Sequence, residues 1–181
     1  MEWLAALRRE YFQRLEQLGV AARLIVDKTP DNFKWIGVLV AAFPEAKIVH
    51  VVRGRCAVLW GIYKQLFIES SFGYSHRLED IVGYQQLHAK LMLHWQHQHP
   101  TRIYTAQYED LVTNPKKFIP ELIDFLGIEW DPACMRFEHT QRAVHTMSSL
   151  QVKRKMVRTQ SEQWRAYAKH LKPYVKRLNC V

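Results

Sequence analysis

The hydrophobic positions along the chain follow helical spacing in some segments and strand-like runs in others. Over residues 2–18, apolar side chains recur at every third or fourth position, which predicts an amphipathic helix that ends at Gly19. The same kind of spacing predicts further helices over 31–43, 56–68, 79–97, 115–126 and 159–172. Short runs rich in β-branched residues predict strands over 22–26, 47–52 and 102–106.

The order of these elements indicates the fold class. Residues 22–68 are predicted to run strand, helix, strand, helix, and a crossover of this kind joins parallel strands. We therefore expect 22–26 and 47–52 to be parallel. No internal repeat and no linker divides the chain. The prediction is one α/β domain over residues 1–181, with a short parallel sheet flanked by helices.

The composition is that of an ordinary globular domain, with 48% hydrophobic and 24% charged residues among 181. No apolar stretch reaches the roughly 20 residues needed to span a bilayer, and the N-terminal MEWLAALRRE does not resemble a secretory signal. The three cysteines are odd in number, widely spaced and without a CxxC pair. This argues against a disulfide framework and against a thiolate zinc site. We therefore expect a reducing, cytoplasmic setting.

The positive charge is concentrated near the C-terminus. The formal net charge is +9, and residues 153–177 hold nine Lys or Arg against the single acid Glu162. Such a segment attracts anions, either nucleic acid, membrane headgroups or a small phosphorylated ligand. Trp164 and Tyr167 are explained as core anchors of the last helix, so the small nucleotide is favoured. Nucleic acid remains the alternative, and a salt titration against random DNA would distinguish the two.

Three polar side chains follow three predicted strands: Lys28, Arg53 and Tyr108. Ligands of open parallel sheets bind beyond the carboxyl ends of the strands, where these groups would converge. Arginine offers a bidentate fork to phosphate and lysine offers a point charge. Each residue also has a purely structural interpretation, with Lys28 solvated in a turn, Arg53 paired with a carboxylate such as Glu109, and Tyr108 packed in the core.

Several stretches resemble one enzyme family. The sequence VDKTPDNF at 26–33 resembles the DK-x-P-x-NF signature of bacterial sulfotransferases, a group often joined to tetratricopeptide repeats and related to tyrosylprotein sulfotransferases. PEAKIVHVVR at 44–53 resembles their P-x-A-x-I-(I/V)-H-x-x-R strand. Further pieces follow in the family's order at 63–67, 108–112, 126–132, 151–152 and Trp164. The resemblance covers about residues 20–170.

The resemblance implies a P-loop-like sulfotransferase fold and transfer of a sulfuryl group from phosphoadenosine phosphosulfate (PAPS) to an acceptor hydroxyl or amine. By motif, Lys28 is similar to the catalytic lysine that contacts the leaving phosphate and the moving sulfuryl group. Arg53 matches the arginine that holds the ribose phosphate, and Tyr108 matches a tyrosine near the nucleotide. The family's loop over the donor corresponds to a stretch that contains Ser148, Ser149, Gln151, Val152, Lys153 and Arg154.

Two departures from the family pattern stand out. The loop P-(R/K)-S-G-(S/T)-(S/T), which cradles the phosphosulfate, does not occur in the 181 residues, and Gly61 stands where the family has a serine beside the arginine. We therefore expect a C-terminal portion of a sulfotransferase, truncated or inactive alone, whose missing loop, central strand and general base come from an upstream segment or a partner chain. The alternative is a non-catalytic remnant that binds nucleotides or polyanions.

Histidines gather at the end of the predicted helix over 79–97. His94 and His97 have the i, i+3 spacing of a metal-binding pair, and His99 follows closely. No acid or thiol lies near them in the sequence, and histidines are common at helix C-termini because they interact favourably with the helix dipole. We expect no metal site.

Overall fold

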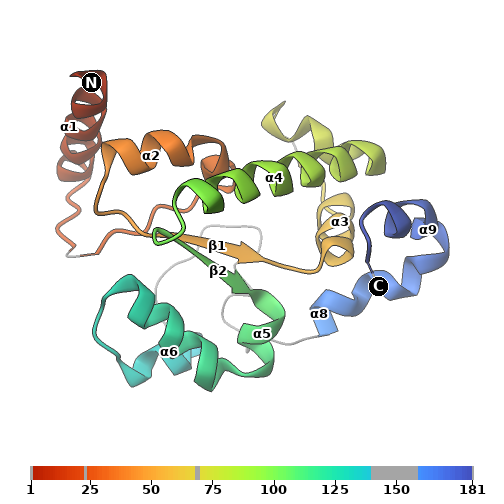
Figure 1. Cartoon of the computed structure of the whole chain (residues 1–181). Coiled ribbons are helices and arrows are strands. Elements are labelled where there is room, and N and C mark those ends of the chain that lie inside the picture. The colour runs from red at the N-terminus through yellow and green to blue at the C-terminus, as the bar shows by residue number, and fades with distance from the viewer. Residues whose placement is uncertain (1, 23, 68–69, 140–158, 181) are drawn as a thin grey trace. The chain divides into compact units, whose positions relative to one another are not determined.

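The computed structural model describes residues 2–22, 24–67, 70–139 and 159–180 (Figure 1). The chain forms two compact units by its internal contacts. The first comprises residues 1–48 and 87–103, and the second comprises residues 49–86 and 104–181. Within the described residues, no helix is both long enough and apolar enough to cross a membrane.

The first unit is helical and has a small apolar core. It contains α1 (Glu2–Gln17), the short 3-10 helix η1 (Pro30–Trp35), α2 (Ile36–Ala42) and the second half of α4 (Leu78–Gln98). The predicted helix over 31–43 is thus divided into a 3-10 turn and an α-helix. The core is made by Ile36, Met92 and Ile103, with Phe33, Val40, Ile48 and Trp95 packed around them.

The indole of Trp95 joins α4 to α2 inside this unit. Its Nε1 donates a hydrogen bond to the carbonyl oxygen of Phe33 at 2.9 Å. The far edge of the ring lies so close to Gly37 that a Cβ there would be 2.8 Å from Cη2 of Trp95. Because the hydrogen bond fixes the ring, only a glycine leaves room for this contact.

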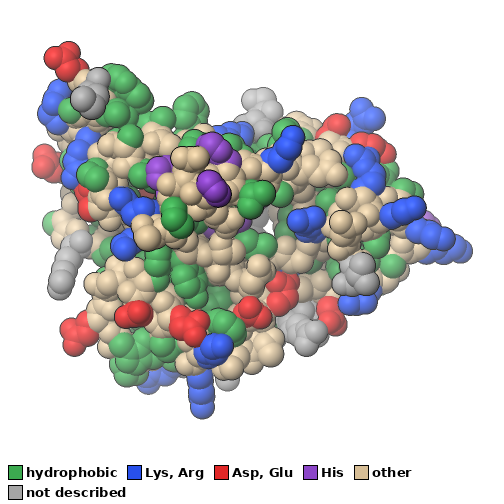
Figure 2. All heavy atoms as spheres, viewed as in Figure 1, with side chains coloured by type: hydrophobic (Ala, Val, Ile, Leu, Met, Phe, Trp, Pro, Cys, Tyr) green, Lys and Arg blue, Asp and Glu red, His purple; other side chains and the backbone are tan. Residues whose placement is uncertain are grey.

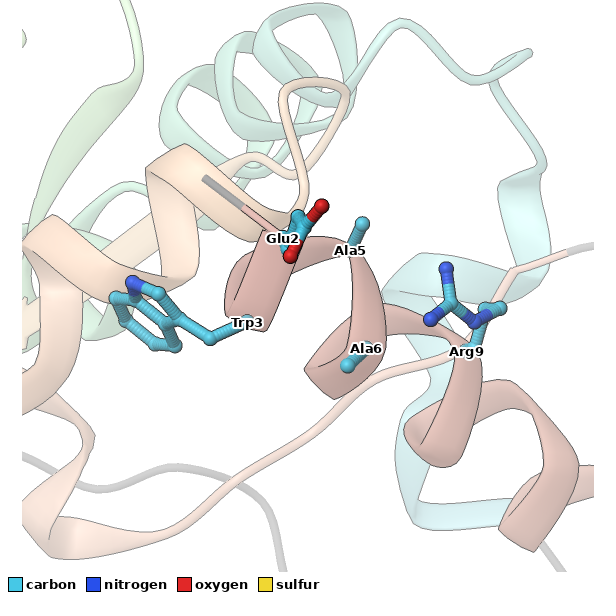
Figure 3. Close-up of a pocket in the computed structure, with 5 residues that line it drawn as sticks. All are labelled: Glu2, Trp3, Ala5, Ala6 and Arg9. Carbon is cyan, nitrogen blue, oxygen red and sulfur yellow. The ribbon is translucent and has the colours of Figure 1, made fainter.

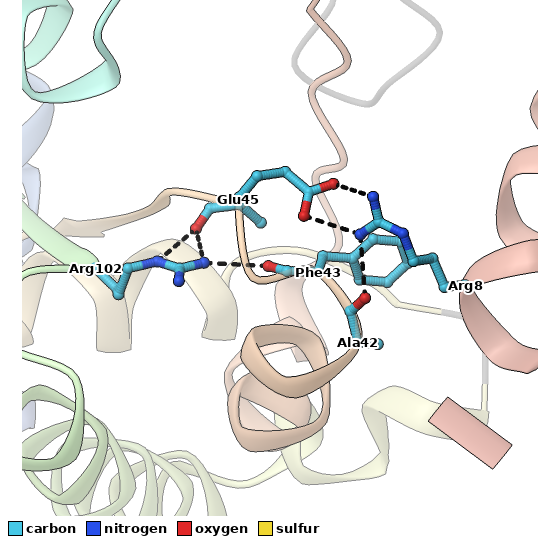
Figure 4. Close-up of polar contacts among 6 residues, drawn as sticks. Arg8, Ala42, Phe43, Glu45 and Arg102 are labelled. Carbon is cyan, nitrogen blue, oxygen red and sulfur yellow. Dashed lines mark hydrogen bonds and ion pairs between the residues drawn. The ribbon is translucent and has the colours of Figure 1, made fainter. Parts of the chain in front are cut away.

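Two arginines hold the turn that leads into the first strand (Figure 4). Arg8 of α1 donates two hydrogen bonds to the carboxylate of Glu45, at 2.6 and 2.8 Å, and a third to the carbonyl of Ala42. The hydrogen bond from Arg8 is the main reason that the pKa of Glu45 lies below its usual value. Arg102 donates to the carbonyls of Phe43 and Ala46. The turn is therefore tied to both α1 and the start of the second strand.

The sheet has two parallel strands, β1 (Ile48–Val52) and β2 (Ile103–Gln107). Apart from its first residue, each strand belongs to the second unit. The other elements of that unit are α3 (Arg55–Tyr63), the 3-10 helix η2 (Ser70–His76), the first half of α4, α5 (Tyr108–Thr113), α6 (Pro115–Leu126), η3 (Pro132–His139), α8 (Thr159–Glu162), η4 (Gln163–Tyr167) and α9 (Ala168–Arg177). The predicted α/β class with a short parallel sheet is confirmed.

The core of the second unit joins α3, α4 and the C-terminal segment. Its buried residues are Cys56, Leu59, Ile81, Val82, Leu171 and Leu178. A disulfide links Cys56 of α3 to Cys180, with the two Cα atoms 5.9 Å apart. The expectation of no disulfide is therefore wrong for this pair. The two cysteines are 124 positions apart, so only the packing of the C-terminal segment on α3 brings them together.

The predicted strand over 22–26 is also wrong for the residues described there. They form no strand, and the side chains of Leu24, Ile25 and Val26 are exposed. A strand needs a neighbour for its backbone hydrogen bonds, and in the described ranges the sheet contains only β1 and β2. The parallel partner of β1 is therefore β2 and not the earlier segment.

We predict that Gly37→Ala destabilises the protein and that Gly83→Ala stabilises it. Alanine at 37 collides with Trp95, which should cost about 1–2 kcal/mol of unfolding free energy even after the gain in helix propensity. Gly83 lies inside α4, and beyond the adjacent backbone of that helix a Cβ at this position would meet nothing within 4 Å, so alanine there should add about 0.5–1 kcal/mol to the free energy of unfolding. Urea unfolding of both variants measures the difference. Equal midpoints would contradict the close contact at Trp95.

We also predict that reduction of the Cys56–Cys180 disulfide lowers the free energy of unfolding by about 2–5 kcal/mol, because a cross-link over a long loop restricts the unfolded chain. Urea unfolding with and without a phosphine reductant measures the change. The control is Cys56→Ser with Cys180→Ser, which should make stability insensitive to the reductant, whereas Cys134→Ser should leave the sensitivity intact. Equal midpoints for the oxidised and reduced protein would overturn this prediction.

Candidate functional site

The turn after β1 places Arg53 at the carboxyl end of the sheet. β1 ends at Val52, Gly54 caps the following helix, and α3 begins at Arg55. The Arg53 side chain is half-buried. Its guanidinium carbon lies 5.1 Å from the centre of the Tyr108 ring, which is the geometry of a cation–π contact.

Tyr108 occupies the matching position after β2, at the first residue of α5. Because β1 and β2 are parallel, their carboxyl ends lie at the same edge of the sheet. The structure thus brings Arg53 and Tyr108 together, two of the three side chains singled out at predicted strand ends. Their role as ligands of a nucleotide stays a prediction.

Glu109 takes part in this turn in a way that the sequence did not indicate. Its Oε1 accepts a hydrogen bond from the backbone N–H of Gly54 at 3.1 Å. The carboxylate therefore holds the turn between β1 and α3, and it forms no ion pair with Arg53 among the described residues. The alternative in which Arg53 is neutralised by Glu109 is not supported.

Ser161 is a further member of the site that sequence reasoning missed. Nε of Arg53 donates a hydrogen bond to its Oγ at 3.0 Å, and the residue is only 8% exposed. Serine and arginine are 108 positions apart, and no local pattern in the sequence links them. Within the described part of the chain, the two terminal nitrogens of Arg53 have no hydrogen-bond partner.

Lys28 belongs to the first unit and lies in the irregular segment before η1, where its side chain is exposed. The neighbouring motif residues are held in place. Asp27 accepts a hydrogen bond from Nδ2 of Asn32 at 3.0 Å and lies 3.5 Å from the hydroxyl of Tyr11. Phe33 packs in the core of the unit. This motif therefore corresponds to a loop that is held in place by Asp27 and Phe33 and that carries an exposed lysine.

The remaining predicted site residues lie outside the described residues. They are Ser148, Ser149, Gln151, Val152, Lys153 and Arg154. The departure from the family pattern at Gly61 lies within the described residues. Gly61 lies in α3, with no atom within 4 Å of a built Cβ. Nη1 of Arg55 is 3.4 Å from the carbonyl oxygen of Leu178. Arg55 therefore contacts the end of the C-terminal segment.

The histidines form no metal cluster among the residues that are described. His94 and His99 pack against the ring of Trp95, which accounts for two of the three. His88 is half-buried, and burial lowers its pKa and so favours the neutral imidazole. These contacts are structural.

A hollow on the surface of α1 is separate from the predicted site residues. It is lined by residues of that single helix, and none of them is a predicted site residue (Figure 3). They are Glu2, Trp3, Ala5, Ala6 and Arg9.

The charged surface of the C-terminal segment is visible in Figure 2, where Lys and Arg side chains protrude around α9. Exposed cations of this helix include Lys169, Lys172, Lys176 and Arg177. Two aromatic residues of the same segment pack against other parts of the second unit. Trp164 packs against the core, and Tyr167 stacks on Trp60 with ring centres 4.0 Å apart.

A family profile, a curated relative and a solved structure all relate this chain to sulfotransferases. The profile described as the sulfotransferase family matches residues 3–132. An uncharacterized protein of Aquifex aeolicus is 32% identical over 174 residues, which are 95% of this chain and 23% of that protein. The omega-hydroxy-beta-dihydromenaquinone-9 sulfotransferase Stf3 of Mycobacterium tuberculosis is 26% identical over 132 residues, which are 67% of this chain and 33% of Stf3. The chain thus spans a third or less of the length of these relatives.

Among solved structures, the sulfotransferase domain from the curacin biosynthetic pathway is similar to this chain. The TM-score is 0.64 at 18% sequence identity, and the match covers 91% of this chain and 67% of that domain. This likeness shows that the fold is similar to a sulfotransferase fold.

Proposed function

The chain belongs to the sulfotransferase family, and from that premise we propose that it binds a phosphorylated adenosine nucleotide at the edge of the sheet formed by Arg53 and Tyr108. The observation that carries this proposal is the geometry around Arg53. Its guanidinium is held at Nε by Ser161 and on one face by Tyr108, and no other described residue bonds to its two terminal nitrogens, so these can bind an anion. A guanidinium fork of this kind matches two oxygens of a phosphate group.

The proposed reaction is transfer of a sulfuryl group from PAPS to an acceptor. PAPS supplies the activated sulfuryl group, and the chain's residues bind and orient it. We assign Arg53 to the ribose phosphate and Tyr108 to the neighbourhood of the nucleotide. Lys28 is the proposed catalytic residue, because a cation beside the leaving phosphate stabilises the negative charge that builds on the bridging oxygen.

The proposal extends to the segment that precedes α8. On the resemblance alone, we assign donor contacts to Ser148, Ser149, Gln151, Val152, Lys153 and Arg154.

The proposed acceptor is a hydroxyl group. The relative Stf3 is named for an omega-hydroxy compound, and this name favours a hydroxyl over an amine. We further propose that both units belong to one sulfotransferase domain, since the family match at residues 3–132 runs through both. The phosphosulfate loop and general base are then supplied by a further segment or a partner chain.

A second candidate function is binding without catalysis, to a nucleotide or a polyanion. The observation that favours it is the basic segment at 153–177, with nine Lys or Arg against one acid. A diffuse basic surface would bind anions through screened charge, whereas the Arg53 site would bind one phosphate in a fixed geometry. The next experiment distinguishes these two modes.

We predict that Arg53→Lys weakens binding of adenosine 3′,5′-bisphosphate about thirtyfold, because loss of a charged bidentate contact costs about 2 kcal/mol. Lys176→Ala is the matched control, since Lys176 is an exposed cation of α9. Its effect should stay below about threefold and vanish at high salt. Calorimetric titration of both variants at two ionic strengths measures this. Equal losses would indicate a diffuse basic surface and overturn the Arg53 site.

We predict that the 181-residue chain binds the nucleotide but transfers little or no sulfuryl group. Saturation with adenosine 3′,5′-bisphosphate at 100 times its dissociation constant should stabilise the fold by about 2.7 kcal/mol. Assays with labelled PAPS and a panel of phenols and alcohols should show only background transfer, because the phosphosulfate loop is absent from these residues. No thermal shift at millimolar nucleotide would overturn the proposed binding, and robust transfer would contradict the need for a further segment.

A further inference from the structure

Ser161 lies at the start of the C-terminal helical segment, within α8, and its hydroxyl reaches the guanidinium of Arg53. The contact is partly buried, because Ser161 is 8% exposed and Arg53 is half-buried. A hydroxyl oxygen that accepts from a cationic N–H makes a charge-assisted hydrogen bond, which is stronger than a neutral one. This bond therefore has a measurable effect on where the guanidinium points.

Which guanidinium nitrogen bonds to Ser161 determines which nitrogens of Arg53 can bind an anion. A guanidinium can bind a phosphate side-on, through Nε and one terminal nitrogen, or end-on, through both terminal nitrogens. Because Nε of Arg53 already donates to Ser161, the side-on mode is occupied. The ring of Tyr108 lies 5.1 Å from the guanidinium carbon and restricts rotation of the plane. The end-on fork is therefore fixed before any nucleotide arrives.

An Arg53 side chain that is ordered before the ligand arrives should bind a phosphate more tightly. A free arginine side chain loses rotamer freedom when it orders on a ligand, and this loss weakens binding. Where the protein orders the side chain beforehand, the ligand does not have to do so. The effect should be confined to ligands that place a phosphate on this fork.

The position of Ser161 does not depend on its own hydroxyl. The segment that carries it is held by the stack of Tyr167 on Trp60 and by the hydrogen bond from Lys64 to Gln163 at 2.8 Å. It is also anchored by the buried side chains Leu171 and Leu178 and by the disulfide to Cys56. Removal of the hydroxyl alone should leave this packing unchanged.

We propose that Ser161 is a positioning residue that orients Arg53 for end-on binding of the ribose phosphate of the nucleotide. The inference rests on the proposed function, since it assumes that Arg53 contacts that phosphate. In the sulfotransferase pattern a serine of α3 lies beside this arginine, but this chain has Gly61 at that position. The hydroxyl comes instead from the C-terminal segment.

The test compares two nucleotides, adenosine 3′,5′-bisphosphate and adenosine 5′-phosphate, which differ only in the ribose 3′-phosphate. Calorimetric titration of the whole chain gives the ratio of the two affinities. Ser161→Ala should lower that ratio about fivefold, and Ser161→Thr, which keeps the hydroxyl, should retain it. Arg53→Lys should lower the same ratio more strongly.

Ser75→Ala is the matched control. Ser75 is another buried serine of the second unit, 2% exposed, and its Oγ has no hydrogen-bond partner among the described residues. Its replacement should leave the affinity ratio unchanged. Thermal unfolding of each variant reports any general loss of structure, and the ratio is insensitive to such a loss because both nucleotides are measured on the same protein.

The possible results distinguish failure of the positioning role of Ser161 from failure of the proposed nucleotide binding. If Arg53→Lys lowers the ratio and Ser161→Ala does not, the positioning role is overturned and the proposed function stands. If Ser161→Ala and Ser75→Ala lower the ratio equally, the effect is general and the inference is also overturned. If the unaltered chain binds neither nucleotide, both the inference and the proposed function fail.

Discussion

The parallel pairing of β1 with β2 is the constraint on which the candidate site depends. Two parallel strands end at the same edge of their sheet, so the residue that follows each strand meets the residue that follows the other. In this chain those residues are Arg53 and Tyr108, and their contact is a direct consequence of the pairing. Glu109 then ties the second strand end to the first through the backbone of Gly54.

The C-terminal segment completes this edge from a distant part of the sequence. Leu171 and Leu178 anchor it in the core beside α3, and the disulfide from Cys56 to Cys180 fixes its far end. The same segment presents Ser161 to Arg53 and carries much of the chain's positive charge. The segment is therefore fixed by packing and by a cross-link, and it holds Ser161 against Arg53.

Features that depend on a local hydrophobic pattern or on a sequence motif could be predicted from the sequence. The β-branched runs locate β1 and β2 to within a residue at each end, and the motifs point to Arg53 and Tyr108, which the structure brings into contact. The segment at 22–26 was misassigned because an apolar run does not reveal whether a pairing partner exists. The Cys56–Cys180 bond and the contact between Ser161 and Arg53 could not be predicted, because tertiary packing creates them across 124 and 108 positions.

The most direct test of the account is a crystal structure of the chain with adenosine 3′,5′-bisphosphate bound. The account predicts that one phosphate lies within hydrogen-bond distance of both terminal nitrogens of Arg53, while Nε of Arg53 keeps its bond to Ser161 and Tyr108 stays beneath the guanidinium. A nucleotide bound elsewhere, or an Arg53 side chain turned away from it, would contradict the central claim that this edge of the sheet is the nucleotide site.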